Sequence, residues 1–194
     1  MLMMNRLRRV TQGGVLTAMA ALLSACASPG LEDYADARPA LVPQRFFNGE
    51  LEARGIVRDY RGRVIRTFDA TLQGVWSAQG HGELRERFVF DDGEVQYRTW
   101  RFTPRADGAL DATAEDVAEP GVLRWAGNAL HMNYVLRIPW RDGTLDVRMD
   151  DWMHAVTPDT VINQTAMSKF GLPVGQVVLV IRQLPSRAQR TPAL

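Results

Sequence analysis

Two adjacent carboxylates, Asp150 and Asp151, have the side-chain type that general acid and base chemistry requires. They open the stretch Asp150-Asp151-Trp152-Met153, which has the alternation of a strand. Neighbouring residues of a strand face opposite sides of the sheet, so these two carboxylates cannot act as a pair on one face. Asp151 shares its parity with Val147 and Met149, and we therefore expect it to point into the interior.

A buried carboxylate needs a partner, because an unpaired charge is costly in an apolar interior. Arg98 and Arg66 are the candidate partners of Asp151. Three interpretations stay open: a structural ion pair, which we prefer, a pair that orients a ligand, and catalysis. Aromatic residues at strand parity predict either plain core or the lining of a pocket. The candidate ligand pocket comprises Arg98, Trp100, Asp151, Trp152 and Asn163.

Motifs of known catalytic and metal sites are missing from the chain. The three histidines, His81, His131 and His154, are dispersed and have no His-Glu-x-x-His spacing around them. The sequence has no Gly-x-Ser-x-Gly elbow, no Ser-x-x-Lys and no glycine-rich phosphate loop after a strand. We therefore predict no catalytic residue, no metal site and no cofactor. The missing motifs favour a protein that is not an enzyme but leave an enzyme open as an alternative.

The only cysteine, Cys26, ends the sequence Leu23-Ser24-Ala25-Cys26. Before it come three arginines within residues 6–9 and a short apolar segment, Gly13–Ala25. This order is typical of a signal peptide, and the apolar segment is shorter than the roughly 20 residues of a membrane-spanning helix. The motif resembles the bacterial lipobox, in which the cysteine sulfur receives a diacylglyceryl group and the chain is cut just before it. The sulfur nucleophile is what this chemistry requires.

Lipidation would make the lipid bilayer a partner of the protein through acylated Cys26. Two or three acyl chains such as palmitate hold a protein on a membrane where one alone is marginal. The next residue is Ala27, where lipobox proteins of the inner membrane commonly have Asp, so we expect the inner leaflet of the outer membrane, facing the periplasm. The alternative is a chance cysteine in an ordinary secretory signal.

Composition favours one folded domain after the signal. Of 194 residues, 46% are hydrophobic, enough for a sizeable core. The formal net charge of +1 falls to −2 once the three signal arginines are removed. The remaining arginines are interleaved with acids, so no basic patch is evident and nucleic acid is excluded as an expected partner.

Four regions follow from these patterns: a signal peptide (1–25), a lipidated cysteine with a flexible tether (26–44), a β domain (45–184) and a disordered tail (185–194). In the β domain, alternating segments are separated by turn signals such as Asp91-Asp92-Gly93. Roughly eight to ten strands without a long amphipathic helix predict an all-β antiparallel meander. Open edges promote aggregation, so we expect a closed, lipocalin-like barrel, with a two-sheet β-sandwich as the alternative.

Several short motifs in order give the chain a resemblance to a known family, DUF3833, over about residues 45–184. They are Phe46-Phe47-Asn48-Gly49, the Asp59 and Gly62 turn, Phe88 to Gly93, Arg98-Thr99-Trp100, Asp150 to Met153, Asn163 to Met167, and Lys169-Phe170-Gly171. The resemblance implies a bacterial protein, in many cases with a lipoprotein signal, and no established activity. Some members of this family are encoded near enzymes that modify membrane fatty acids. The resemblance therefore suggests a connection with lipid.

These observations lead to a membrane-anchored periplasmic lipoprotein whose barrel binds a fatty-acyl or other apolar ligand. A different class of function is an envelope scaffold, in which the barrel is filled by its own side chains and its outer surface binds a protein. The least favoured alternative is an enzyme that acts on lipid, with Asp151 and Arg98 in its site. An internal apolar cavity of ligand-site size, about 300–1,000 Å³, would favour a ligand or an enzyme, whereas a filled core would favour the scaffold.

Overall fold

The structure is a computed structural model in which residues 29–140 and 142–185 are described. The predicted signal peptide, Cys26 and the residues after 185 lie outside this range. The chain divides into the units Met1–Gly30 and Leu31–Leu194, and the fold is that of the second unit. Within the described ranges, no helix is long and apolar enough to cross a membrane.

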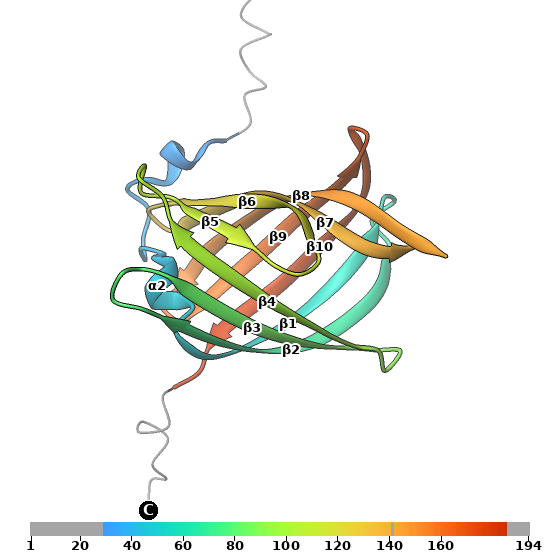
Figure 1. Ribbon diagram of the computed structural model, residues 1–194, viewed down its shortest axis with the longest axis horizontal. Coiled ribbons are helices and arrows are strands. Elements are labelled where there is room, and N and C mark those ends of the chain that lie inside the picture. Colours follow the sequence, from blue (N-terminus) through green and yellow to red (C-terminus); the bar gives the residue numbers. More distant parts are fainter. Residues whose placement is uncertain (1–28, 141, 186–194) are drawn as a thin grey trace, which may run out of the picture. The chain divides into compact units, whose positions relative to one another are not determined.

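Ten strands make up the described part of the second unit (Figure 1). They are β1 (Gly49–Asp59), β2 (Val64–Trp76), β3 (Gly82–Phe90), β4 (Val95–Pro104), β5 (Leu110–Thr113), β6 (Val117–Ala126), β7 (Ala129–Trp140), β8 (Gly143–Thr157), β9 (Thr160–Lys169) and β10 (Leu172–Gln183). From residue 29 on, two short helices precede them, the 3-10 helix η2 (Leu31–Tyr34) and the α-helix α2 (Pro43–Phe46).

Each strand is antiparallel to the next, and β1 pairs with β10 from Leu51↔Gln183 to Asp59↔Gly175, which closes the sheet. The prediction of an antiparallel meander closed into a lipocalin-like barrel is therefore confirmed, and the sandwich alternative is excluded. The strand β5 is short and ends at Thr113, and residues 114–116 form a connection to β6.

Strand periodicity divides the side chains between the interior and the outer surface. In β2, Phe68, Ala70 and Leu72 are buried and the residues between them are exposed. Successive side chains of a strand point to opposite faces, so in a closed barrel one of the two sets must fill the interior. The buried core accordingly draws on every strand.

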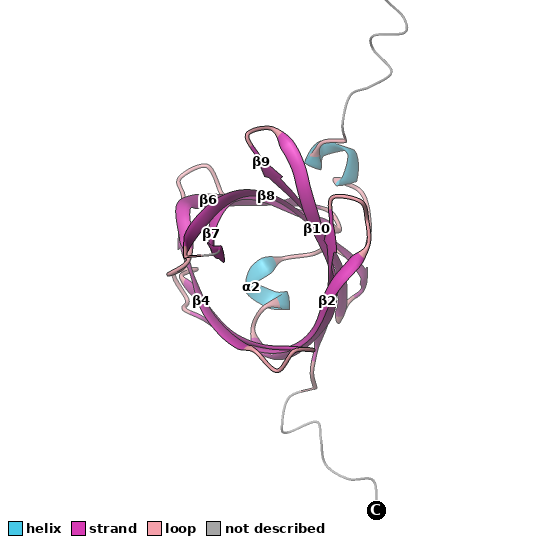
Figure 2. Ribbon diagram, turned by 90° about the vertical axis from the view of Figure 1, so that its right-hand side faces the viewer, coloured by secondary structure: helices cyan, strands magenta, loops and turns pink. Residues whose placement is uncertain are grey.

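One end of the barrel is covered by α2 and the residues beside it, which lie across the opening in Figure 2. Leu41, Phe46 and Phe47 are 4% exposed or less. The Trp76 indole donates a hydrogen bond of 3.2 Å to the Phe47 carbonyl, and Gly74 leaves room for that carbonyl. We refer to this end as the α2 end.

The prediction of a flexible tether over 26–44 is wrong for its second half. Tyr34 packs against the rings of Trp152 and His154, and the Leu41 amide donates to the Gly127 carbonyl at 2.8 Å. The polar and proline-rich composition of this segment suggested a free chain. Its few apolar side chains are ordered, however, because they cover apolar surface of the barrel.

The opposite end is formed by the β1–β2, β3–β4, β7–β8 and β9–β10 hairpins, and we call it the hairpin end (Figure 1). Inward-facing apolar residues toward this end pack against the core but are only partly buried. They are Val57, Phe88, Phe90, Ile138, Leu145, Met167, Val177 and Leu179. Inside the closed wall, side chains toward the hairpin end are therefore less completely buried than those in the middle of the barrel.

Candidate functional site

A set of polar side chains lies inside the barrel among these apolar residues. Strand alternation turns Glu86 of β3, Arg98 of β4, Tyr134 of β7 and Asp151 of β8 inward, each next to apolar residues of the same parity. Glu86 and Arg98 are direct cross-strand partners. Polar groups at such positions need hydrogen-bond partners from other elements, because the neighbouring apolar side chains offer none.

Arg98 donates its hydrogen bonds to Asp116. Its Nε lies 2.9 Å from Asp116 Oδ2 and its Nη2 lies 2.8 Å from the same oxygen. Asp116 is in the 114–116 connection, which is fixed by a 2.7 Å hydrogen bond from the Arg137 amide to the Asp116 carbonyl. The connection thus brings a carboxylate to Arg98 that the strand pattern alone would not supply. A bidentate pair of this kind is among the stronger charge-assisted contacts.

Glu86 is the second carboxylate beside Arg98. Its Oε2 is 3.7 Å from Arg98 Nη1, and this buried oxygen accepts no hydrogen bond. Burial raises the pKa of Glu86 to about 7, against the lowering effect of the Arg98 charge. Burial also opposes the charge of Arg98, but the Glu86 and Asp116 carboxylates outweigh it, so the pKa of Arg98 is raised. One cation therefore serves two carboxylates.

Asp151 has a separate set of partners on β9. It accepts hydrogen bonds from Asn163 Nδ2 and, at 3.1 Å, from Thr165 Oγ1. All three residues are 5% exposed or less. Burial raises the pKa of Asp151 to about 6, and the hydrogen bonds from Asn163 and Thr165 act in the opposite direction.

The expectation that Asp151 pairs with Arg98 or Arg66 is wrong. Arg98 is committed to Asp116, and Arg66 donates to Asp92 at 2.9 Å and to Glu94 at 2.8 Å. Uncharged donors two positions apart on the neighbouring strand meet the requirement instead: Thr165 is directly opposite Asp151, and Asn163 is its diagonal neighbour, opposite Met153. Tyr134 lies within electrostatic range of both Asp151 and Arg98. Its pKa is raised by burial and by the charge of Asp151.

The five predicted pocket residues do not all converge. Arg98, Trp100, Asp151 and Asn163 face the interior, where the Trp100 ring packs edge-on against Tyr134 with 5.2 Å between centroids. Trp152 is on the outer surface, because it follows Asp151 on the strand. There it stacks on His131 at 4.2 Å between centroids. The outer face also carries a contact of 2.6 Å between His131 Nε2 and Asp150 Oδ1.

An aromatic surface continues from the polar set toward the hairpin end. Phe68 contacts Phe88 and Phe90, each at 5.6 Å between centroids. The Arg66 guanidinium lies over the Phe90 ring at 3.7 Å. Gly55 permits this packing, since a Cβ there would come within 2.4 Å of the Phe68 ring. These rings give the accessible part of the interior an apolar wall.

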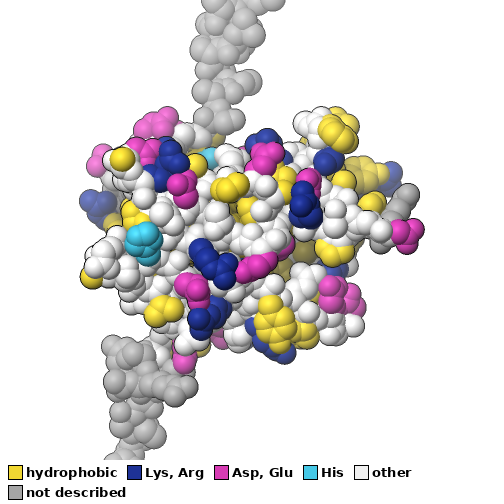
Figure 3. All heavy atoms as spheres, in the orientation of Figure 1, with side chains coloured by type: hydrophobic (Ala, Val, Ile, Leu, Met, Phe, Trp, Pro, Cys, Tyr) yellow, Lys and Arg dark blue, Asp and Glu magenta, His cyan; other side chains and the backbone are white. Residues whose placement is uncertain are grey.

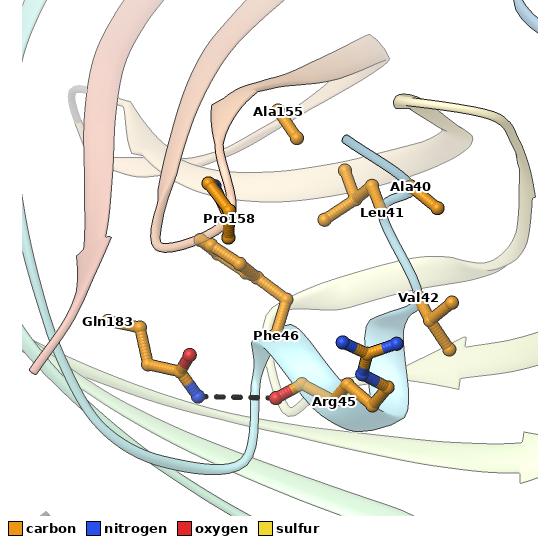
Figure 4. A pocket seen from close by; sticks show the side chains of 8 residues that line it. All are labelled: Ala40, Leu41, Val42, Arg45, Phe46, Ala155, Pro158 and Gln183. Carbon is orange, nitrogen blue, oxygen red and sulfur yellow. Dashed lines mark hydrogen bonds between the residues drawn. The ribbon is translucent and has the colours of Figure 1, made fainter. Parts of the chain in front are cut away.

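A small pocket at the α2 end is shown in Figure 4. It has a volume of about 70 Å³ and lies between the segment 40–46 and the β8–β9 turn. Gln183 lies at the edge of the pocket, and its Nε2 donates a hydrogen bond of 3.2 Å to the Arg45 carbonyl. Ligand sites commonly measure about 300–1,000 Å³, so this pocket does not have room for an acyl ligand.

The sequence model of a family of proteins of unknown function, DUF3833, matches residues 20–183. The chain belongs to the DUF3833 family. This confirms the resemblance seen in the sequence motifs. No curated protein matches the chain. Among solved structures, an S-type phycobiliprotein lyase from Guillardia theta is similar with 10% identity and a TM-score of 0.49, over 82% of this chain and 100% of that chain.

Several interior residues of this DUF3833 protein were not predicted as site residues. Glu86 has the parity of Leu84 and Phe88, a signal in the sequence that an inward carboxylate was present. Asp116 and Thr165 gave no comparable signal, because a loop and a barrel closure bring them to their partners. Within residues 29–140 and 142–185, no group of three or more potential metal ligands is placed to hold an ion.

Proposed function

We propose that this DUF3833 protein is a lipoprotein of the bacterial cell envelope whose barrel binds the hydrocarbon part of a lipid or a similar apolar ligand. The observation that carries this proposal is the set of eight half-buried, inward-facing apolar residues near the hairpin end. Burying apolar surface contributes about 25 cal/mol per Å², so an acyl chain that covered these residues would gain binding energy.

The two ends of the interior separate this proposal from the scaffold alternative. At the α2 end the barrel is filled by its own side chains, including Leu51 and Leu130, which are 1% exposed or less. Trp76, Trp125 and Met153 toward this end are also partly buried, but α2 lies across it, whereas no helix of the described residues covers the hairpin end. The half-buried residues toward the hairpin end favour a ligand instead.

Charge in the interior bears on the polar end of the ligand. Arg98 is matched by Asp116 and Glu86, and Arg66 is matched by Asp92 and Glu94. Neither cation is left over for a carboxylate ligand, whereas Glu86 Oε2 has an unused acceptor site. A hydroxyl or amine head that donates a hydrogen bond is therefore a better match than a fatty-acid carboxylate.

Anchoring through acylated Cys26 would fix the orientation of the barrel. Only four residues, 27–30, separate Cys26 from Leu31, a reach of at most ~17 Å. The following segment is attached at the α2 end through the contacts of Tyr34 and Leu41. The anchored protein would thus keep its α2 end near the membrane that holds it and direct the hairpin end away.

Ligand binding is tested by native mass spectrometry and lipid extraction on a chain that starts at residue 27, exported to the periplasm. This part contains the whole hydrophobic core, which runs from Leu41 to Ile181, so it is expected to fold alone. A co-purifying acyl species at about one per chain supports the proposal. An empty, stable monomer that also fails to bind added palmitic acid, hexadecanol and hexadecylamine contradicts it.

The same three probes test the preference for the head group. We expect hexadecanol or hexadecylamine to bind at least about tenfold more tightly than palmitic acid, a difference of about 1.4 kcal/mol. Glu86→Gln is expected to reduce that preference for the amine. Tighter binding of palmitic acid would contradict the head-group assignment and leave the apolar site intact.

A further inference from the structure

We propose that the hairpin end of the barrel is a docking surface for an anionic lipid bilayer, with Phe170 and Tyr60 entering the headgroup region. This surface consists of the β1–β2 and β9–β10 hairpins, which lie side by side because β1 pairs with β10. It is distinct from Cys26 and from the interior of the barrel. Because the proposed anchor would hold the α2 end at its own membrane, the bilayer that docks here is one that faces the anchored protein, not the one that holds the anchor.

Phe170 is the most exposed large apolar residue of the described chain, at 91%. It occupies the β9–β10 turn with a φ of +51°, a left-handed conformation that is unfavourable for a bulky side chain and well suited to glycine. The Lys169 ammonium lies 4.9 Å from the ring centroid, but the ring is not part of the core, so core packing does not account for a phenylalanine here. A role outside the domain accounts for both the strain and the exposure.

Other apolar side chains are exposed around Phe170. Leu172 on β10 is 68% exposed, and Tyr60, at the tip of the neighbouring β1–β2 hairpin, is 64% exposed. Trp140 on the β7–β8 hairpin at the same end is 54% exposed. Apolar side chains gather at the β9–β10 hairpin in the upper right of Figure 3. Single exposed apolar residues are ordinary, but aromatic tips grouped at one end are typical of an interaction site.

Charge identifies a bilayer as the occupant. Near its tip the β1–β2 hairpin carries Arg58, Arg61 and Arg63 against one acid, Asp59, and β9 adds Lys169. This half of the end is therefore positive and complements lipid phosphates. A second copy docked through the same surface would bring like charges together. Aromatic rings beside basic residues are also the combination enriched where proteins meet membrane interfaces.

Vesicle binding tests the proposal, using the chain from residue 27 with phosphatidylcholine vesicles and with vesicles containing about one third phosphatidylglycerol. We expect the protein to co-sediment with the anionic vesicles, and the bound fraction to fall as salt rises. Phe170→Gly should weaken binding at least about fivefold. Glycine accepts this φ, so the variant should have a melting temperature equal to or above that of the wild type.

A matched control is Val75→Ser, which removes a 56% exposed apolar residue from β2 near the α2 end and should leave vesicle binding unchanged. Binding of Phe170→Gly and of a Tyr60→Ser, Phe170→Gly double variant at the wild-type level would overturn the proposal. Failure of the wild type to bind anionic vesicles would also overturn it. A self-associating protein whose dimer is lost in Phe170→Gly would assign this surface to a second copy instead.

Discussion

Glu86 Oε2 lies 3.7 Å from Arg98 Nη1, yet Arg98 directs its hydrogen bonds to Asp116. The interior consequently holds one more carboxylate than Arg98 can neutralise. An incompletely paired charge in a buried site lowers stability unless it is protonated or receives a donor. This relationship makes Glu86 the residue most sensitive to pH and to the head group of a ligand.

Stability should decrease as pH rises from about 5 to about 8. The folded-state pKa of Glu86 is raised to about 7 and that of Asp151 to about 6, above their usual values of 4.5 and 3.8. Between the unfolded and folded pKa values the folded state binds more protons, so the free energy of unfolding falls with rising pH. Urea unfolding at several pH values measures this slope.

Glu86→Gln should remove most of that slope. The variant is expected to gain about 1–3 kcal/mol relative to the wild type on going from about pH 5 to about pH 8. Glu83→Gln, on the outward parity of the same strand, is the control and should retain the wild-type slope. Equal pH dependence in Glu86→Gln and the wild type would contradict the assignment.

Arg98→Lys should destabilise the domain by about 2–4 kcal/mol, because a lysine ammonium cannot reproduce the two-point contact with Asp116 and leaves the buried Glu86 and the partly exposed Asp116 poorly paired. Chemical denaturation at neutral pH measures the loss. Arg101 is on the same strand as Arg98 and forms an exposed ion pair with Glu115. Arg101→Lys should therefore lower the free energy of unfolding by less than about 1 kcal/mol. Similar losses in both variants would argue against a special role of Arg98.

Gly74→Ala should loosen the α2 end. A Cβ at this position would lie 1.6 Å from the Phe47 carbonyl oxygen, so the backbone beside α2 must move and the hydrogen bond from Trp76 must weaken. We expect a loss of about 2–4 kcal/mol in the free energy of unfolding. Gly143→Ala, which meets no atom within 4 Å, should change stability by less than about 0.5 kcal/mol.

Val177→Trp should block the accessible part of the interior. Val177 faces inward on β10 opposite Val57, and both are partly buried, so an indole there can occupy the space that an acyl chain would use. Binding of a fluorescent acyl probe should fall at least about tenfold while the fold is retained by circular dichroism. Val180→Trp, outward on the same strand and 44% exposed, should bind the probe as the wild type does.

Local signals in the sequence were sufficient for most of the fold. Turn sequences such as Asp91-Asp92-Gly93 fixed where strands end, and alternation fixed which side chains share a face. Alternation predicted that Asp151 points inward, and the structure places Arg98, Trp100 and Asn163 on the same inner face. Alternation also separates Trp152 from Asp151, which is why Trp152 does not belong with the interior group.

Partner choice was decided by the tertiary structure. Asp116 reaches Arg98 from a loop, and Asn163 and Thr165 reach Asp151 from the next strand, contacts that depend on register and on the path of the 114–116 connection. Strand parity defines a face but not the distances within it. Likewise, composition predicted a flexible tether over 26–44. In the structure, Tyr34 and Leu41 of this segment pack against the barrel, which buries apolar surface. The sequence by itself determined the strands and their faces, since those depend on neighbouring residues, and only the closed barrel determined which charges meet.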